Sequence, residues 1–146
     1  MHPTFWLPDT MKIRLTDIQF TDIEYRVKTF DKEVTAELET TLGISVGVAD
    51  ESTSENQFAI VLEIGLTNKR KTFKFKTKAT AHFEASEKIN ENFANSPFAR
   101  INAPAIAFPY VRTFISNFTL NSGYNPIMLP SFNFVEMTKE APAAKE

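Results

Sequence analysis

Residues 57–83, which read QFAIVLEIGLTNKRKTFKFKTKATAHF, decide the fold of this chain. On both sides of the polar segment 68–71, apolar side chains recur at every second position, which is the period of a β-strand with one buried face. The segment NKRK is typical of a turn. The flanking runs 57–67 and 72–83 are therefore predicted to be consecutive strands of an antiparallel sheet.

Residues 34–48 show the same alternation, with mostly apolar even positions and with polar residues or glycine at the odd positions. This pattern predicts one long, half-buried strand. The linker 49–56, ADESTSEN, is acidic and rich in turn-forming residues, so it is expected to join strands 34–48 and 57–67 as an antiparallel hairpin.

The first predicted strand, residues 13–27, is less regular, because its apolar residues change parity twice along the sequence. A regular strand cannot place all of them on one face. We therefore expect a bulge near Thr16 and Asp17. The alternative is that a partner covers parts of both faces.

After residue 84 the apolar spacing becomes helical. Ser86 is predicted to cap a short helix that runs through Phe93 to Phe98. A longer helix is predicted to begin with Asn102 as its cap and Pro104 in its first turn, and to stop at Gly123. Its apolar positions follow i, i+3 and i+4 spacing: Ile106, Phe108, Val111, Phe114, Ile115 and Phe118.

Pro109 lies inside the longer predicted helix, and we expect it to kink the helix or to mark its true start. The apolar but proline-fenced residues 124–134 are predicted to form an extended arm, and the tail that follows is expected to be frayed. The predicted fold is therefore α+β: a four-stranded antiparallel sheet, then a short and a long helix packed on one face.

The composition argues against several classes of function. The 146 residues include no Cys and only two His, which excludes disulfides, thiolate zinc sites and a thiol nucleophile. No two-histidine metal motif, phosphate-binding glycine loop or G-x-S-x-G elbow occurs. The cluster Asp17, Asp22 and Glu24 is interpreted as a solvated face rather than a metal site. We therefore expect no enzyme activity, no cofactor and no metal.

The net charge of −2 argues against a binder of nucleic acids or membranes that relies on bulk charge. No run of 18 apolar residues is present, and the first residues lack the features of a signal peptide. We expect a cytoplasmic protein with no direct membrane insertion. Residues 1–11, which include Phe5 and Trp6, could add a strand or hang free.

The chain has more apolar surface than one sheet and two short helices can hide. The arm 124–134, the Phe-rich helix 104–122 and the flanks of the first strand contribute to this surplus. Such a surplus indicates an oligomer interface, which the pattern favours, or a groove for a peptide or an apolar ligand.

Three segments resemble the signature block of SecB, the bacterial protein-export chaperone family. They are NAPAIAFPYVR at residues 102–112, Ile115-Ser116, and GYNPIMLPSFNF at residues 123–134. The segment TDIQF at residues 16–20 is also similar. The resemblance covers residues 12–135, which we interpret as one SecB-like domain, with residues 1–11 as an N-terminal extension and residues 136–146 as a flexible tail.

The resemblance implies an ATP-independent holdase without catalysis, which binds unfolded preproteins in apolar grooves and keeps them unfolded for export. It also implies a homotetramer, a dimer of dimers with the long helices between the dimers. The implied peptide-binding residues are Val34, Ala36, Leu38, Phe132, Phe134 and Met137. The implied oligomer interface comprises Phe108, Tyr110, Phe114, Ile115 and Phe118. The peptide-binding residues would equally suit an ordinary core or a subunit interface, because a buried strand face has the same pattern.

The resemblance further implies a face of the sheet that docks onto the translocation motor SecA, with Asp17, Lys74 and Lys76 at matching positions. Asp17 retains an acidic residue, but the two lysines replace an apolar residue and a glutamate. Six of the 16 cationic residues lie between positions 69 and 78. We expect an inverted charge on this face, which speaks against coupling to SecA.

This basic strip has three interpretations: a solvated face that guards against aggregation, a dock for an acidic partner, and a nucleic-acid platform. The last is disfavoured because Phe73 and Phe75 alternate with the lysines and so face away from them.

Two other functions remain open. One is a dedicated SecB-like chaperone for a single cytosolic client such as an antitoxin, which the altered docking face favours. The other is a small-ligand-binding or hydrolytic α+β protein with a hot-dog-like sheet around a central helix. The sequence does not name the client or choose between a dimer and a tetramer.

Overall fold

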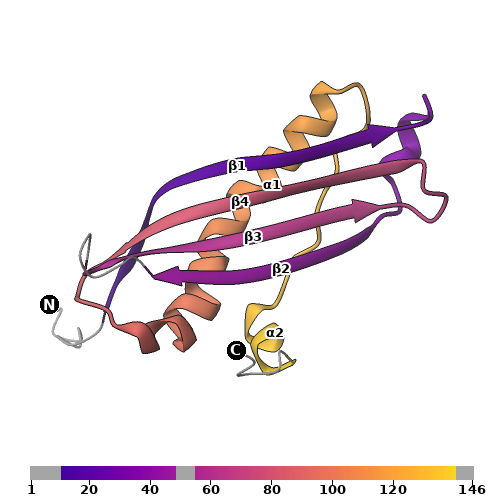
Figure 1. The fold of residues 1–146 in the computed structure, drawn as a ribbon. Helices are drawn as coiled ribbons and strands as arrows, with labels where there is room; N and C mark the ends of the chain where they lie inside the picture. Colours follow the sequence, from indigo (N-terminus) through magenta and orange to yellow (C-terminus); the bar gives the residue numbers. More distant parts are fainter. Residues whose placement is uncertain (1–10, 49–54, 141–146) are drawn as a thin grey trace, which may run out of the picture.

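Four antiparallel strands form one sheet, and a long helix crosses one of its faces (Figure 1). The computed structural model describes residues 11–48 and 55–140. The strands are β1 (Ile13–Val27), β2 (Glu39–Val48), β3 (Gln57–Thr67) and β4 (Phe73–Ala85), in the spatial order β1-β4-β3-β2. The predicted α+β architecture is thus confirmed. The linker 49–54 and the extension up to residue 10 lie outside the described residues.

The β3–β4 hairpin is the centre of the sheet and follows the predicted alternation. Phe58 pairs with Phe83 and Leu66 with Phe75, and these side chains are buried on the face toward the helix. The Asn68 Oδ1 atom accepts hydrogen bonds from the backbone N–H groups of Thr72 and Phe73, at 2.9 and 3.1 Å, which holds the turn. Asn68 thus helps to set the register of the hairpin, in which the apolar side chains of β3 and β4 are buried together.

Strand β2 is shorter than predicted, because it begins at Glu39 rather than at residue 34. Glu39 pairs with Thr67, the last residue of β3, so the residues before Glu39 have no strand to pair with. They instead form the 3₁₀ turn η1 (Lys32–Thr35), in which Asp31 Oδ1 accepts a hydrogen bond from the Glu33 N–H at 2.9 Å. The predicted strand residues Val34, Ala36 and Leu38 therefore lie outside the sheet.

Strand β1 has two irregularities. The register against β4 shifts between Leu15 and Asp17, which confirms the predicted bulge. A second shift, between Thr21 and Glu24, was not predicted, and Asp22 there has a φ of 54°. Since each shift changes the parity of the strand, the apolar residues of β1 pack against the core except Ile23, which lies within the second shift and is exposed.

The segment between the sheet and the long helix differs from the prediction. Ser86 caps no helix; its Oγ atom accepts a hydrogen bond from the Lys12 N–H at 2.9 Å. The first helical turn is the 3₁₀ turn η2 (Glu91–Asn95), capped by Asn90. A π-helical turn, η3 (Phe98–Asn102), then leads directly into the helix, so Asn102 is helical and makes no cap.

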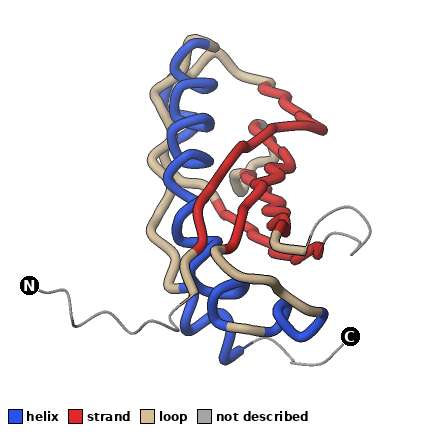
Figure 2. The backbone as a smooth tube through the Cα atoms, turned by 90° about the vertical axis from the view of Figure 1, so that its left-hand side faces the viewer, coloured by secondary structure: helices blue, strands red, loops and turns tan. Residues whose placement is uncertain are grey.

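Helix α1 (Ala103–Asn121) has Pro104 in its first turn and Pro109 inside it, so Pro109 does not mark its start. Gly123, with a φ of 99°, follows its end as predicted. The buried side chains of α1 include Phe108, Val111 and Ile115, which face the sheet. Figure 2 shows the helix and the strands as two layers, with the chain after α1 running back along the helix.

The C-terminal part is more ordered than the predicted flexible tail. Helix α2 (Phe134–Glu140) follows the arm, and Asn133 Oδ1 accepts a hydrogen bond from the Glu136 N–H at 3.1 Å at its start. Asparagine followed three residues later by glutamate is a helix-start signal that the sequence contained. Residues 141–146 lie outside the described part of the chain.

Candidate functional site

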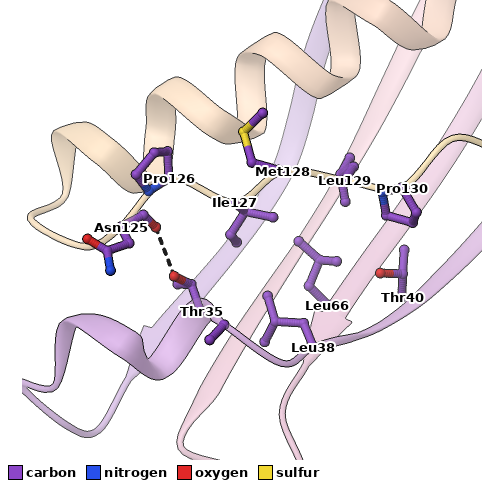
Figure 3. A pocket seen from close by; sticks show the side chains of 11 residues that line it. Thr35, Leu38, Thr40, Leu66, Asn125, Pro126, Ile127, Met128, Leu129 and Pro130 are labelled. Carbon is purple, nitrogen blue, oxygen red and sulfur yellow. Dashed lines mark hydrogen bonds between the residues drawn. The ribbon is translucent and has the colours of Figure 1, made fainter.

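A trough lined by both apolar and polar residues lies between the arm and the start of β2 (Figure 3). The trough is a cavity of about 270 Å³, and the arm comprises residues 124–133. One wall is the arm, and the other is formed by the chain from η1 to β2 and by Leu66 of β3. The lining residues are Thr35, Ala36, Leu38, Thr40, Leu66, Asn125, Pro126, Ile127, Met128, Leu129 and Pro130.

The arm builds its wall through alternation. Ile127 and Leu129 are buried, whereas Met128 and Pro130 are exposed. Figure 3 shows Ile127 on the side of the trough that faces Leu38, with Met128 on the opposite side, toward α1. Pro126 and Pro130 keep the segment extended, because a proline ring holds its own φ near −65° and disfavours a helical residue before it.

Hydrogen bonds close one end of the trough. The Thr35 hydroxyl donates to the Asn125 carbonyl oxygen at 2.8 Å, the contact drawn in Figure 3. The Tyr124 hydroxyl donates to the Thr29 carbonyl oxygen at 2.9 Å. The first residues of the arm are therefore tied to the chain between β1 and β2.

A second cavity, of about 590 Å³, lies on the other side of the segment 36–38. Ala36 and Leu38 line both cavities, so this segment separates them. The charged residues of the second cavity are Asp31, Glu33, Glu37, Glu39, Lys69 and Arg70. The trough, whose lining residues carry no charge, thus borders a cavity with six charged lining residues, and the irregular start of β2 lies between them.

The structure divides the six predicted peptide-binding residues into separate groups. Ala36 and Leu38 line the trough, while Val34 is buried and lines the second cavity. The rings of Phe132 and Phe134 pack against Phe108 of α1, at centroid distances of 5.1 and 6.0 Å.

Phe134 is buried, and Met137 is half-buried against the core. Neither they nor Phe132 line the trough. The trough residues that the prediction missed are Ile127 and Leu129 of the arm and Leu66 of β3. The sequence predicts an apolar arm between prolines. The alternation of Ile127 and Leu129 with Met128 and Pro130 is the additional signal that indicates which side chains face inward.

The outer face of the sheet, opposite α1, carries charges of both signs rather than the expected basic strip. Lys74 Nζ lies 3.1 Å from Glu24 Oε2, and Lys78 Nζ lies 3.6 Å from Asp22 Oδ2 and 3.9 Å from Glu63 Oε2. The hydrogen bond and the charge of Lys74 lower the pKa of the Glu24 carboxyl below its ordinary value. Each of these lysines therefore has an acidic neighbour.

The three predicted docking residues do not form one patch. Lys74 and Lys76 border a hollow of about 1020 Å³ on the outer face, together with Gly43 and Gly65. Asp17 pairs with His82, six residues farther along β4 than Lys76 and thus roughly 20 Å away at about 3.4 Å per residue. Its carboxylate accepts a hydrogen bond from the Ile18 N–H at 2.9 Å.

Four of the five predicted interface residues of α1 pack inside the protomer. Phe108 and Ile115 are buried, Phe114 stacks on Phe20 at 4.0 Å, and Phe118 contacts Tyr25 at 5.0 Å between centroids. The apolar spacing had found the side of α1 that faces its own sheet. The exposed side instead has Tyr110, 53% exposed, together with Ile106 and Leu120.

The described residues contain no group of three His, Asp or Glu side chains placed to hold a metal ion. In the same part of the chain, no helix combines the length and the apolar character needed to cross a membrane.

Comparison with known proteins gives a consistent result. A family model described as SecB, preprotein translocase subunit SecB, matches residues 9–145. The protein-export protein SecB of Ruegeria pomeroyi is 21% identical over 145 residues, which are 95% of this chain and 87% of that protein. SecB of a Jannaschia species is 28% identical over 108 residues, 67% of this chain and 60% of that protein.

The fold is also similar to that of a solved structure, the SecB-like chaperone Rv1957 of Mycobacterium tuberculosis in complex with a ChAD peptide from the antitoxin HigA1. The TM-score is 0.63 at 15% identity, and the match covers 83% of this chain and 90% of that one. At this identity the likeness concerns the fold.

Proposed function

The chain belongs to the SecB family, and we propose that it is an ATP-independent holdase that binds unfolded polypeptides along the trough. The match of the family model to residues 9–145 carries this proposal. The members of this family are chaperones rather than enzymes. The hot-dog-like ligand-binding or hydrolytic alternative is therefore set aside.

The physical chemistry of the trough suits a holdase. Its volume of about 270 Å³ lies just below the roughly 300–1,000 Å³ of small-molecule pockets, so it holds a few side chains of an extended chain. Eight of its eleven lining residues are apolar, and they alternate with polar groups such as Thr40 and the Asn125 backbone. Contacts with apolar side chains do not require one client sequence. A protein that binds only the unfolded form of a client shifts the client's folding equilibrium without an energy source.

The trough is tested by placing a charge in it. Leu38→Asp places a carboxylate beside Leu66, Ile127 and Leu129. We therefore expect the affinity for a denatured model protein to fall about tenfold, measured as weaker suppression of its aggregation. Ser45→Asp, on the exposed outer face of β2, adds the same charge outside the trough and serves as the control. Equal suppression by Leu38→Asp and the wild type would show that clients bind elsewhere.

We further propose a homotetramer in which the exposed side of α1 contributes to the contact between subunits. Three large side chains, Ile106, Tyr110 and Leu120, are exposed along this side of the helix, with the polar residues Thr113 and Asn117 between Tyr110 and Leu120. Four subunits would also let one long client bind several troughs at once, which raises the overall affinity without new contacts.

A second candidate role is that of a dedicated chaperone for one cytosolic client, with no coupling to SecA. The mixed charge of the outer face favours it, because an acidic face suited to a basic partner is absent from the described sheet. If the chain has this role, we expect purified SecA not to bind it at physiological salt. We also expect its affinities for unrelated unfolded proteins to differ by more than tenfold. Tight SecA binding with uniform client affinities would favour the export role instead.

A further inference from the structure

Three polar side chains are buried in the described part of the chain, and all three are threonines. Thr35, Thr77 and Thr119 are 8%, 4% and 0% exposed. A buried hydroxyl needs a hydrogen-bond partner, because burial without one is costly. The hydroxyls of Thr35 and Thr119 both bond to backbone groups of the arm, whereas that of Thr77 donates to the Thr21 carbonyl oxygen of β1.

Thr119 joins α1 to the arm. Its Oγ1 atom accepts a hydrogen bond from the Ile127 N–H at 3.0 Å and donates to the Ile115 carbonyl oxygen at 3.0 Å. The Ser116 carbonyl oxygen lies nearby at 3.2 Å. The arm has no strand neighbour, so this hydroxyl supplies the partner that a sheet would otherwise give to the buried Ile127 N–H.

Thr35 holds the same stretch of the arm from the opposite side. Its hydroxyl donates to the Asn125 carbonyl oxygen at 2.8 Å, two residues before Ile127. Two buried hydroxyls from different elements therefore hold two arm residues, Asn125 and Ile127, by their backbone. The Thr35 contact lies at the closed end of the trough (Figure 3).

Beyond Ile127 the contacts of the arm with α1 are weaker. The Ser116 hydroxyl lies 4.0 Å from Met128 Sδ, and Arg112 Nη2 lies 3.3 Å from Ser131 Oγ. Both are near the limits for such contacts, and the Met128 and Ser131 sites are exposed. The position of the arm thus rests on the burial of Ile127 and Leu129 and on the hydrogen bonds made before Leu129, those of the two threonines and of the Tyr124 hydroxyl.

We propose that Thr119 and Thr35 are positioning residues, which set the width of the trough and thereby the affinity for unfolded clients. This inference rests on the proposed holdase function. Replacing the Thr119 hydroxyl by a methyl group leaves the N–H of the buried Ile127 without its partner, and the same change at Thr35 removes the hydrogen bond to the Asn125 carbonyl oxygen. The arm then moves toward water, and Ile127 and Leu129 leave the wall that clients contact.

Thr119→Val tests this role, because valine has nearly the shape of threonine but no hydroxyl. The probe is reduced, carboxymethylated α-lactalbumin, which is permanently unfolded. We expect the variant to bind it about tenfold more weakly and the Ile127 amide to exchange its hydrogen at least tenfold faster. Thr119→Ser, which keeps the hydroxyl, should restore both properties. Thr35→Val, on a separate element, should weaken binding similarly.

Thr77→Val is the matched control. Thr77 is also buried, and its hydroxyl donates to the Thr21 carbonyl oxygen at 3.0 Å, beside the second irregularity of β1. We expect this variant to lower the melting temperature as Thr119→Val does, with client affinity unchanged. A purely structural role would lower affinity equally in both variants.

The possible outcomes are distinct. If Thr119→Val speeds exchange at Ile127 but binds the probe as tightly as the wild type, or leaves exchange unchanged, the positioning role is wrong. If Thr119→Val does not fold, Thr35→Val alone decides. Failure of the wild-type protein to bind the probe at all would overturn the proposed function itself.

Discussion

On the outer face of the sheet, Lys74 forms an ion pair with Glu24, and Lys78 lies near Asp22 and Glu63. The Glu24 carboxyl has a lowered pKa, chiefly through its hydrogen bond and charge interaction with Lys74 and to a smaller extent through Lys76. The lowered folded-state pKa means that the pair stabilises the fold above the ordinary pKa of the carboxyl. This contribution is lost as the pH falls through the lowered value. Since both groups are exposed, its effect on stability is small.

Lys74→Gln therefore should raise the pKa of Glu24 toward its ordinary value, as measured by NMR titration of the side-chain carboxyl carbon. Lys76→Gln is the control and should raise it less, because Lys76 contributes only a weaker charge interaction. An unchanged pKa in Lys74→Gln would mean that the ion pair does not form in solution.

At the scale of elements, the sequence predicts the parts that depend on local periodicity. The hairpin of β3 and β4, the bulge near Thr16 and the end of α1 at Gly123 all follow from residue patterns. The early start predicted for β2 failed because the pattern 34–38 is strand-like, yet the pairing partner ends at Thr67. Whether a strand forms depends on its neighbour, which periodicity does not reveal.

The candidate site shows the same limit. Leu38 and Ala36 were identified from the family resemblance, and they do line the trough. Thr119 was missed because its position on α1, four residues after Ile115, suits an apolar side chain. Its role becomes visible only when the arm folds back beside the helix and presents the Ile127 N–H.

The exposed side of α1 gives a prediction about assembly. Wild-type protein should have a solution mass of about four times the 16.6 kDa of the chain, and Tyr110→Asp should lower it to that of a smaller assembly, because the substitution places a charge in an apolar contact. Phe30→Asp is the control, since Phe30 is 98% exposed and lies outside the helix. A monomeric wild type, or an unchanged mass in Tyr110→Asp, would contradict this interface.

At the scale of the whole molecule, the central feature is that the trough and the outer face of the sheet are separate surfaces. The trough, which no charged residue lines, lies at one edge between the arm and the start of β2, while the outer face of the sheet carries charges of both signs. A client that is bound in the trough leaves the outer face available. Client binding and contacts with other partners can therefore occur on separate surfaces.

The most direct test of the account is methyl NMR of the assembled protein during addition of unfolded α-lactalbumin. We expect the methyl signals of Leu38, Leu66, Ile127 and Leu129 to shift or broaden, because they line the trough. The signals of Ile60 and Leu62, which are fully buried in the sheet and do not line it, should stay unchanged. Shifts confined to methyl groups outside the trough, with Ile127 and Leu129 unaffected, would contradict the account.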